Sequence, residues 1–104
     1  MRVDRVVVEP NVARAGGTVH LGTTYTILTA NPNQTVAVHE TREVRHNGTL
    51  VANPTTAFTR SSGTFTSALP ITLPFGAGRG NYEVITVVAV GDRSSRGMSN
   101  FVVQ

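Results

Sequence analysis

Residues 80–103, GNYEVITVVAVGDRSSRGMSNFVV, contain two segments of recurring apolar residues around a charged turn that is bounded by glycines. In the first segment, alternate positions define two faces. One face holds Tyr82, Val84, Val88 and Val90, and the other holds Ile85, Val87 and Ala89. A repeat of two is the repeat of a β-strand. The stretch therefore predicts a terminal hairpin, with strands at 81–91 and 97–103 and a loop over 91–97.

The rest of the chain follows the same pattern. Apolar residues alternate or form short runs between Gly, Pro, Asn and Ser, and no window sustains a helical repeat. The remaining strands are expected at 2–9, 17–30, 35–46, 49–52, 56–60 and 63–73. Asn47 and Gly48 form the dipeptide most typical of a tight hairpin. Pro70 and Pro74 remove ladder donors, so we expect the strand at 63–73 to lie at a sheet edge or to bend.

Short strands at regular spacing, with turn signals between them, predict an all-β fold: an antiparallel sandwich of seven or eight strands. The length of 104 residues suits one domain, so residues 1–104 are expected to form a single unit. The chain has no cysteine, which excludes disulfides, thiolate metal sites and a cysteine nucleophile. Stability must come from packing.

The net charge of +3 comes from nine arginines that are scattered along the chain, several beside an acid. Because no stretch is a basic run, we favour an ordinary solvated surface over a nucleic-acid site. The opening residues MRVDRVVVEP lack the apolar core of a secretory signal, and no stretch approaches a membrane-spanning length. We expect no nucleic-acid partner, no membrane insertion and no signal peptide in this segment.

No set of side chains predicts catalysis or metal binding. His39 and Glu40 resemble the start of a zinc-protease motif, but position 43 is Glu and the stretch alternates like a strand. His20, His39 and His46 could join as ligands across a sheet, although isolated histidines on strands more often face solvent. No serine lies in a nucleophile elbow, no acids pair closely, and GAGRG at 76–80 precedes a strand instead of a helix. We expect no catalytic residue, no metal, no cofactor and no enzyme activity.

Charges of both signs alternate through residues 40–45, where Glu40, Arg42, Glu43 and Arg45 occupy four of six positions. One interpretation is a polar interface. The other is an exposed or edge strand that charge protects from aggregation, and we favour this second one.

The segment GRGNYEVITVVAV resembles the sixth strand of immunoglobulin-like and fibronectin type III-like domains, where a Gly-x-Tyr-x-Val run starts an alternating strand. The resemblance implies that the Tyr82 hydroxyl bonds back to the preceding loop, and that Val84 stands where antibody domains place a cysteine. The segment VEPNVARAGGTVHLGTTYTI is similar to the opening of bacterial immunoglobulin-like modules, which implies that Val19, Leu21, Tyr25 and Ile27 face the core. Because the chain has no Trp and no Cys, a generic bacterial module is the better match.

The resemblance implies a non-enzymatic module that acts as a spacer, adhesion or protein-binding domain of a larger bacterial surface or secreted protein. Its partners would be neighbouring domains or another protein, outside the cell or in the cell envelope. A free-standing binding protein, such as an inhibitor or a phage structural component, and an accessory domain of a hydrolase remain alternatives. The expected contacts are Arg93, Ser94, Ser95 and Arg96 in the last hairpin, with Arg79 in the preceding loop.

The strand from Tyr82 is apolar on both faces, whereas a two-sheet sandwich buries only one. Ile85 and Val87 lie on the second face. Cover by this same chain, or a bulge that changes register, is the favoured explanation. A modest partner surface at Ile85 and Val87 is the hypothesis that we keep beside it.

Overall fold

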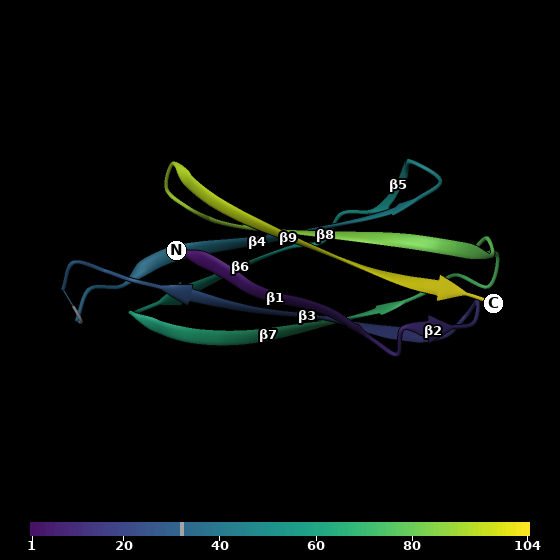
Figure 1. Ribbon diagram of the computed structural model, residues 1–104, viewed down its shortest axis with the longest axis horizontal. Coiled ribbons are helices and arrows are strands. Elements are labelled where there is room, and N and C mark those ends of the chain that lie inside the picture. The colour runs from purple at the N-terminus through teal and green to yellow at the C-terminus, as the bar shows by residue number, and fades with distance from the viewer. Residues whose placement is uncertain (32) are drawn as a thin grey trace.

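The computed structural model describes residues 1–31 and 33–104 and shows two β-sheets packed face to face in an elongated molecule of 48 × 21 × 18 Å (Figure 1). The three-stranded sheet has the order β1-β3-β7, with bounds Arg2–Glu9, Thr18–Ile27 and Gly63–Thr72. The second sheet has the order β2-β9-β8-β4-β5, with β6 also pairing with β4. Its strands are β2 (Val12–Ala13), β4 (Val36–His46), β5 (Thr49–Ala52), β6 (Thr55–Arg60), β8 (Gly80–Val90) and β9 (Arg93–Val103).

The all-β prediction is confirmed. Strands pair antiparallel except for β2, which runs parallel to β9. The described residues form nine strands and no helix, whereas seven or eight strands were expected. The additional strand is the two-residue β2, which is too short to show alternation.

The expected loop at 91–97 is wrong. The turn comprises Gly91 and Asp92, and β9 begins at Arg93, directly opposite Val90. Residues 93–96 contain no apolar side chain, so no alternation of apolar and polar residues predicts a strand there. They form a strand because backbone groups pair with β8 regardless of side chain.

The core lies between the sheets in two apolar clusters. The larger cluster contains Val8, Ala13, Val19, Leu21, Val44, Leu73, Tyr82, Val84, Phe101 and Val103. The smaller one contains Tyr25, Ile27, Val38 and Val88. The inward face expected for β3 is confirmed, because all four of its named residues belong to these clusters. On β8, Tyr82, Val84 and Val88 are buried as expected, while Val90 is half-buried.

The two sheets approach closely where β1 crosses β9. A Cβ added to Gly97 would lie 2.7 Å from Val6 Cγ2 and 3.1 Å from Val3 Cγ1. The amide of Val3 donates to Ser95 Oγ at 3.1 Å. Because Gly97 has no side chain, β1 can pack closely against β9.

The position of β7 agrees with the proline that it contains, Pro70. Among the described strands, β7 pairs only with β3 and forms an edge of the three-stranded sheet, with Pro70 opposite His20. The prediction of an edge strand is confirmed.

Candidate functional site

An apolar pocket of about 330 Å³ lies at the end of the molecule where the chain finishes. Its walls are formed by residues 71–78, by the β4–β5 hairpin and by Tyr82. Its lining is Val44, His46, Val51, Ala52, Ile71, Thr72, Leu73, Pro74, Gly76, Ala77, Gly78 and Tyr82. Apart from His46, Thr72 and Tyr82, these residues are apolar or glycine, so the pocket suits an apolar group.

A stack of three aromatic rings lies at this end of the molecule. The Tyr82 ring lies between those of His46 and Phe101, with centroid distances of 4.2 and 5.0 Å and interplanar angles of 12° and 16°. The Tyr82 hydroxyl donates to the carbonyl of Gly78 at 2.8 Å. The loop hydrogen bond implied by the resemblance is thus present, and it ties residues 73–79 to the core.

The imidazole of His46 is held in place and does not project freely into the pocket. Its Nδ1 lies 3.0 Å from the carbonyl oxygen of Asn81, which can only accept, so Nδ1 carries the hydrogen of this bond. A Cβ added to Gly78 would lie 3.0 Å from His46 Nε2. A ring stacked, hydrogen-bonded and covered in this way acts as packing.

Three exposed apolar side chains surround the same end. Leu50 and Val51 on β5 are 44% and 52% exposed, and Phe75 in the loop is 92% exposed. The carboxyl end is close by, because Val103 pairs with Gly80 at the start of β8. In Figure 1, β5 and the C-terminus lie at the same end of the molecule. Val51 lines the pocket, whereas Leu50, its neighbour on β5, is opposite Arg45 and points to the other side of the strand. We call Leu50, Val51, Phe75 and the pocket, which share this end of the molecule, the carboxyl-end surface.

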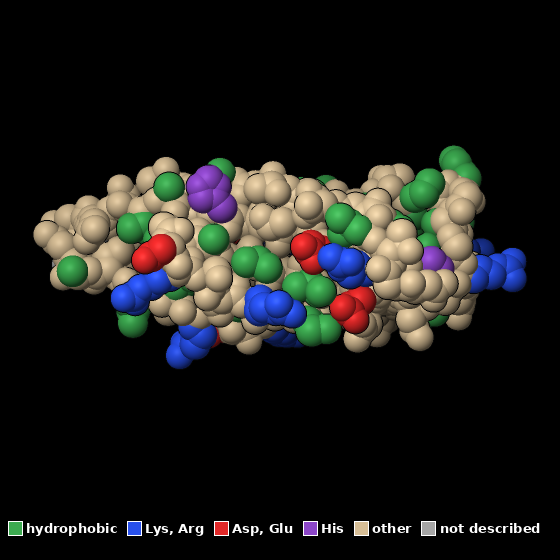
Figure 2. Space-filling model, turned by 90° about the horizontal axis from the view of Figure 1, so that it is seen from above, with side chains coloured by type: hydrophobic (Ala, Val, Ile, Leu, Met, Phe, Trp, Pro, Cys, Tyr) green, Lys and Arg blue, Asp and Glu red, His purple; other side chains and the backbone are tan. Residues whose placement is uncertain are grey.

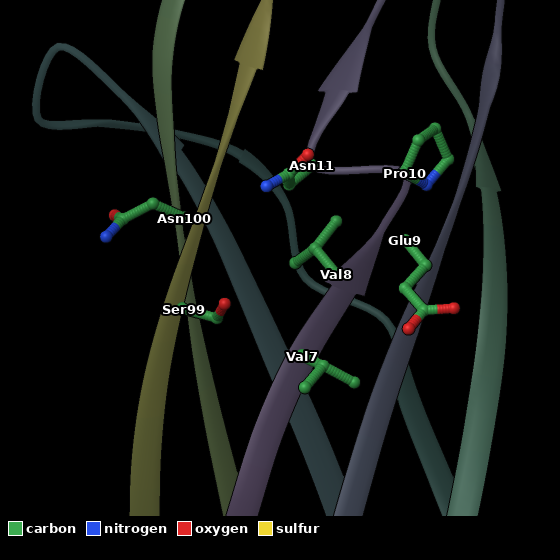
Figure 3. A pocket seen from close by; sticks show the side chains of 7 residues that line it. All are labelled: Val7, Val8, Glu9, Pro10, Asn11, Ser99 and Asn100. Atoms are coloured by element: carbon green, nitrogen blue, oxygen red, sulfur yellow. The ribbon is translucent and has the colours of Figure 1, made fainter.

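A second depression of about 650 Å³ is a wide groove between β1 and β9 (Figure 3). It is lined by Val7, Val8, Glu9, Pro10, Asn11, Ser99 and Asn100. Figure 3 shows the side chains of Glu9 and Asn100 on opposite sides and pointing away from each other. Polar groups that diverge cannot act together on one reacting atom. This groove therefore offers no catalytic arrangement.

The prediction for Glu40 and Arg42 is wrong, because both are buried at 0% and 1% exposure. Strand β4 is not an edge. It has β8 on one side and both β5 and β6 on the other, since β8 pairs with residues 39–46, β6 with 36–41 and β5 with 44–46. Glu40 and Arg42 point inward, between the two apolar clusters, while Glu43 and Arg45 are half-exposed. Which side chains of β4 are buried depends on the strand order, and the sequence of one strand does not reveal that order.

The buried charges form a hydrogen-bonded network. Tyr25 donates to Glu40 Oε2 at 2.6 Å, and Ser67 donates to Glu40 Oε1 at 2.5 Å. Arg42 Nη2 donates to Glu40 Oε1 at 3.2 Å and to Ser67 Oγ at 2.9 Å. Arg60 Nε reaches the Tyr25 oxygen at 3.4 Å. Burial raises the pKa of Tyr25 above its ordinary value and the bond to Glu40 raises it further, while Arg60 opposes both.

The expected contact residues do not form one site. Arg79 precedes β8 and Arg93 follows it, so they lie at opposite ends of a strand of 11 residues, roughly 35 Å apart at about 3.3 Å per residue. Arg93, Ser94 and Arg96 are exposed on β9, whereas Ser95 is half-buried and faces β1. Arg79 and residues 93–96 therefore lie in two separate places, and their role as partner contacts stays a prediction.

Ile85 and Val87 lie together on the outer face of β8. Val87 is opposite Arg96 on one side and Thr41 on the other, and Ile85 is opposite Met98 and Glu43. These neighbours leave both residues half-buried, and no register shift occurs along β8. The same chain therefore covers Ile85 and Val87 only in part. The other explanation, a bulge that changes the register of β8, is wrong. Figure 2, which views this sheet from outside, shows hydrophobic side chains interspersed with acidic and basic ones.

The three histidines are separated. His20 is on the outer face of the three-stranded sheet, His39 is on the outer face of the other sheet, and His46 is in the ring stack. Within residues 1–31 and 33–104, no three His, Asp or Glu side chains are placed to hold a metal ion. The described part of the chain also contains no helix that is long and apolar enough to cross a membrane.

Comparison with known proteins gives a fold and no family. No model of a known protein family matches the chain, and no curated protein matches its sequence. Among solved structures, the chain is similar to Spo0M, a sporulation control protein from Bacillus subtilis, with a TM-score of 0.70 and 13% sequence identity. The match covers 99% of this chain and 49% of Spo0M, so the chain spans about half the length of that protein.

Proposed function

We propose that this chain is a non-enzymatic, immunoglobulin-like module that binds a neighbouring domain of a longer protein through its carboxyl-end surface. Strand order supports the immunoglobulin-like part of the proposal. Strands β1, β3 and β7 correspond to A, B and E, and β4, β8 and β9 correspond to C, F and G, with Tyr82 as the corner tyrosine at the start of F. The pairing of β6 with β4 instead of β7 differs from the constant-type domain.

The proposal that this surface binds a neighbouring domain rests on one observation. Three of the seven large apolar side chains that are exposed among the described residues, Leu50, Val51 and Phe75, lie with the apolar pocket at the end where the chain finishes. Exposed apolar residues around a concave centre are typical of an interface between proteins or domains. A domain that follows Gln104 would begin beside this surface and could cover it without a long linker.

The likeness to Spo0M supports the same proposal. Because 99% of this chain matches 49% of a longer protein, the chain has the size of one domain in a protein of several domains. A role in spacing or protein binding also requires no converging reactive groups, in keeping with the apolar lining of the pocket.

The test compares hydrogen exchange in residues 1–104 alone with exchange in the complete product of the parent gene. We expect amides of residues 50–52 and 71–78 to exchange more slowly in the complete protein, while amides of residues 64–68 are unchanged. In the complete protein, Val51→Asp should remove this protection. The matched control is Leu28→Asp, at a side chain that is 79% exposed at the opposite end, and it should not. Equal exchange in the two proteins, or a gene that stops after Gln104, would contradict the proposal.

A further inference from the structure

The two edges of the three-stranded sheet differ in their protection against pairing with another strand. Edge strand β1 carries Arg2, Asp4, Arg5 and Glu9, and its register shifts between Val3 and Arg5. Charges and irregularities of this kind keep an edge from pairing with a second chain. Edge strand β7, Gly63–Thr72, is ten residues long without a charged residue, and its pairing with β3 shows no register shift. Only Pro70, near its end, limits the edge.

The backbone of β7 is available on its outer side. Strand β7 pairs with β3 alone, and no backbone hydrogen bond from residues 63–72 to a further described strand is present. Peptide groups on an unpaired edge bind a further strand readily, and this is how many proteins capture an extended segment.

The side chains on β7 define what a partner strand must carry. Phe65, Ser67, Leu69 and Ile71 are half-buried and face the other sheet, while Thr64, Thr66, Ala68 and Thr72 are exposed on the outer face. A partner strand would need apolar residues on its inner positions and small polar residues on its outer ones. Strand β7 itself meets this requirement at Phe65, Leu69 and Ile71 on its inner side and at its outer threonines, while Ser67 at the centre is polar and is already bonded to Glu40.

We propose that β7 pairs antiparallel with β7 of a second copy of this chain, which joins two three-stranded sheets into one of six. Pairing centred on Ser67 places Phe65 of each copy opposite Leu69 of the other, and Thr66 opposite Ala68. An uncharged strand can meet itself in this way without bringing like charges together. The outer Thr pairs that already link β3 and β7, Thr24 with Thr66 and Thr26 with Thr64, border the new pairing.

The dimer is weak, because one strand pair buries less than the roughly 1,200–2,000 Å² of a stable interface. Sedimentation equilibrium over a concentration series should show a reversible monomer–dimer equilibrium. Ala68→Lys introduces a charge at the centre of the edge and should leave a monomer with an unchanged melting temperature. Thr59→Lys adds the same charge to exposed β6, an edge of the other sheet, and should dimerise like the original chain.

Cross-linking tests the register, since the chain has no cysteine of its own. Residues directly opposite in an antiparallel pair have Cα atoms about 4.5–5.5 Å apart, which a disulfide can span. Under mild oxidation, Thr66→Cys chains mixed with Ala68→Cys chains should form the mixed dimer in excess over either like dimer, and Thr59→Cys should form little.

A monomer at every concentration would overturn the proposal, as would a dimer that survives Ala68→Lys or is lost equally with Thr59→Lys. A dimer without preference for the mixed cross-link would overturn the register. These outcomes can be told apart from a failure of the proposed function. The dimer is measured on residues 1–104 by sedimentation and by variants at Thr66 and Ala68, whereas the carboxyl-end surface, which includes Ile71 and Thr72 at the end of β7, is tested by comparison with the complete protein and by Val51→Asp.

Discussion

Tyr25 shows how a single hydroxyl joins the apolar core to the buried charges. Its ring packs in the smaller cluster, and its oxygen donates to Glu40, 2.6 Å away. Ionising this phenol would place a second negative charge beside a buried carboxylate, and the Nε of Arg60, 3.4 Å away, offsets this only in part. The neutral form is therefore favoured in the folded chain, in agreement with a raised pKa of Tyr25.

This preference predicts a loss of stability in alkali. Because the pKa of Tyr25 is higher in the folded chain than in the unfolded chain, folding favours the protonated phenol. The stabilisation is complete below about pH 10, the pKa of an unperturbed tyrosine, and is lost as pH rises above it. Few other side chains titrate in this pH range, because the chain has no lysine, no cysteine and only two tyrosines.

Urea denaturation at a series of pH values between about 8 and 11 measures the effect. Tyr25→Phe should be less stable at neutral pH by about 1–3 kcal/mol, because Glu40 loses a buried donor. Its stability should also fall less steeply above about pH 10. If wild type and Tyr25→Phe lose stability in parallel, the link between Tyr25 and alkaline unfolding is wrong.

Strand β4 allows a buried ion pair and an exposed ion pair to be compared within one strand. It carries two Glu–Arg pairs with the same spacing: Glu40 with Arg42, which is buried, and Glu43 with Arg45, whose side chains are 32% and 36% exposed. Removing one partner of a buried pair leaves an uncompensated charge and costs about 3–5 kcal/mol. An exposed pair contributes about 0–1 kcal/mol.

We expect Arg42→Ala to lower the free energy of unfolding by about 3–5 kcal/mol and Arg45→Ala by less than about 1 kcal/mol. Chemical denaturation of both variants, with the same slope in denaturant, measures the difference. Replacing both buried partners with apolar residues, Glu40→Leu with Arg42→Met, should recover most of the loss. Equal effects of Arg42→Ala and Arg45→Ala would show that burial of the first pair contributes nothing.

The same strand shows where prediction from sequence succeeds and where it ends. Alternation located most strands to within a few residues, and the resemblance to bacterial immunoglobulin-like modules implied the inward side of β3, where apolar residues recur on one face. On β4 both faces carry charges, so alternation gives the period without telling which face is inside. That choice depends on β8, β5 and β6, whose positions beside β4 arise from pairing between distant segments. The carboxyl-end surface was missed for the same reason, although the apolar pair Leu50 and Val51 after the Asn-Gly turn was visible.

At the scale of the whole molecule, a polar layer divides the core without dividing the fold. Strand β3 contributes Leu21 to the larger cluster and Ile27 to the smaller one, and β4 and β8 likewise contribute to both. Three continuous strands therefore connect the two ends of a molecule 48 Å long. Because their hydrogen bonds pass through the polar layer unbroken, we expect the two ends to unfold together.

Two matched variants on β3 test this cooperativity. Leu21→Ala and Ile27→Ala each remove a side chain that is no more than 2% exposed, and each should cost about 2–5 kcal/mol. In native-state hydrogen exchange, either variant should lower the protection of slow amides on β8 near Val84 and near Val88 by the same amount, because those amides exchange through unfolding of the whole chain. Loss confined to the end that carries the substitution would instead mean that Glu40 and Arg42 separate two units that unfold independently.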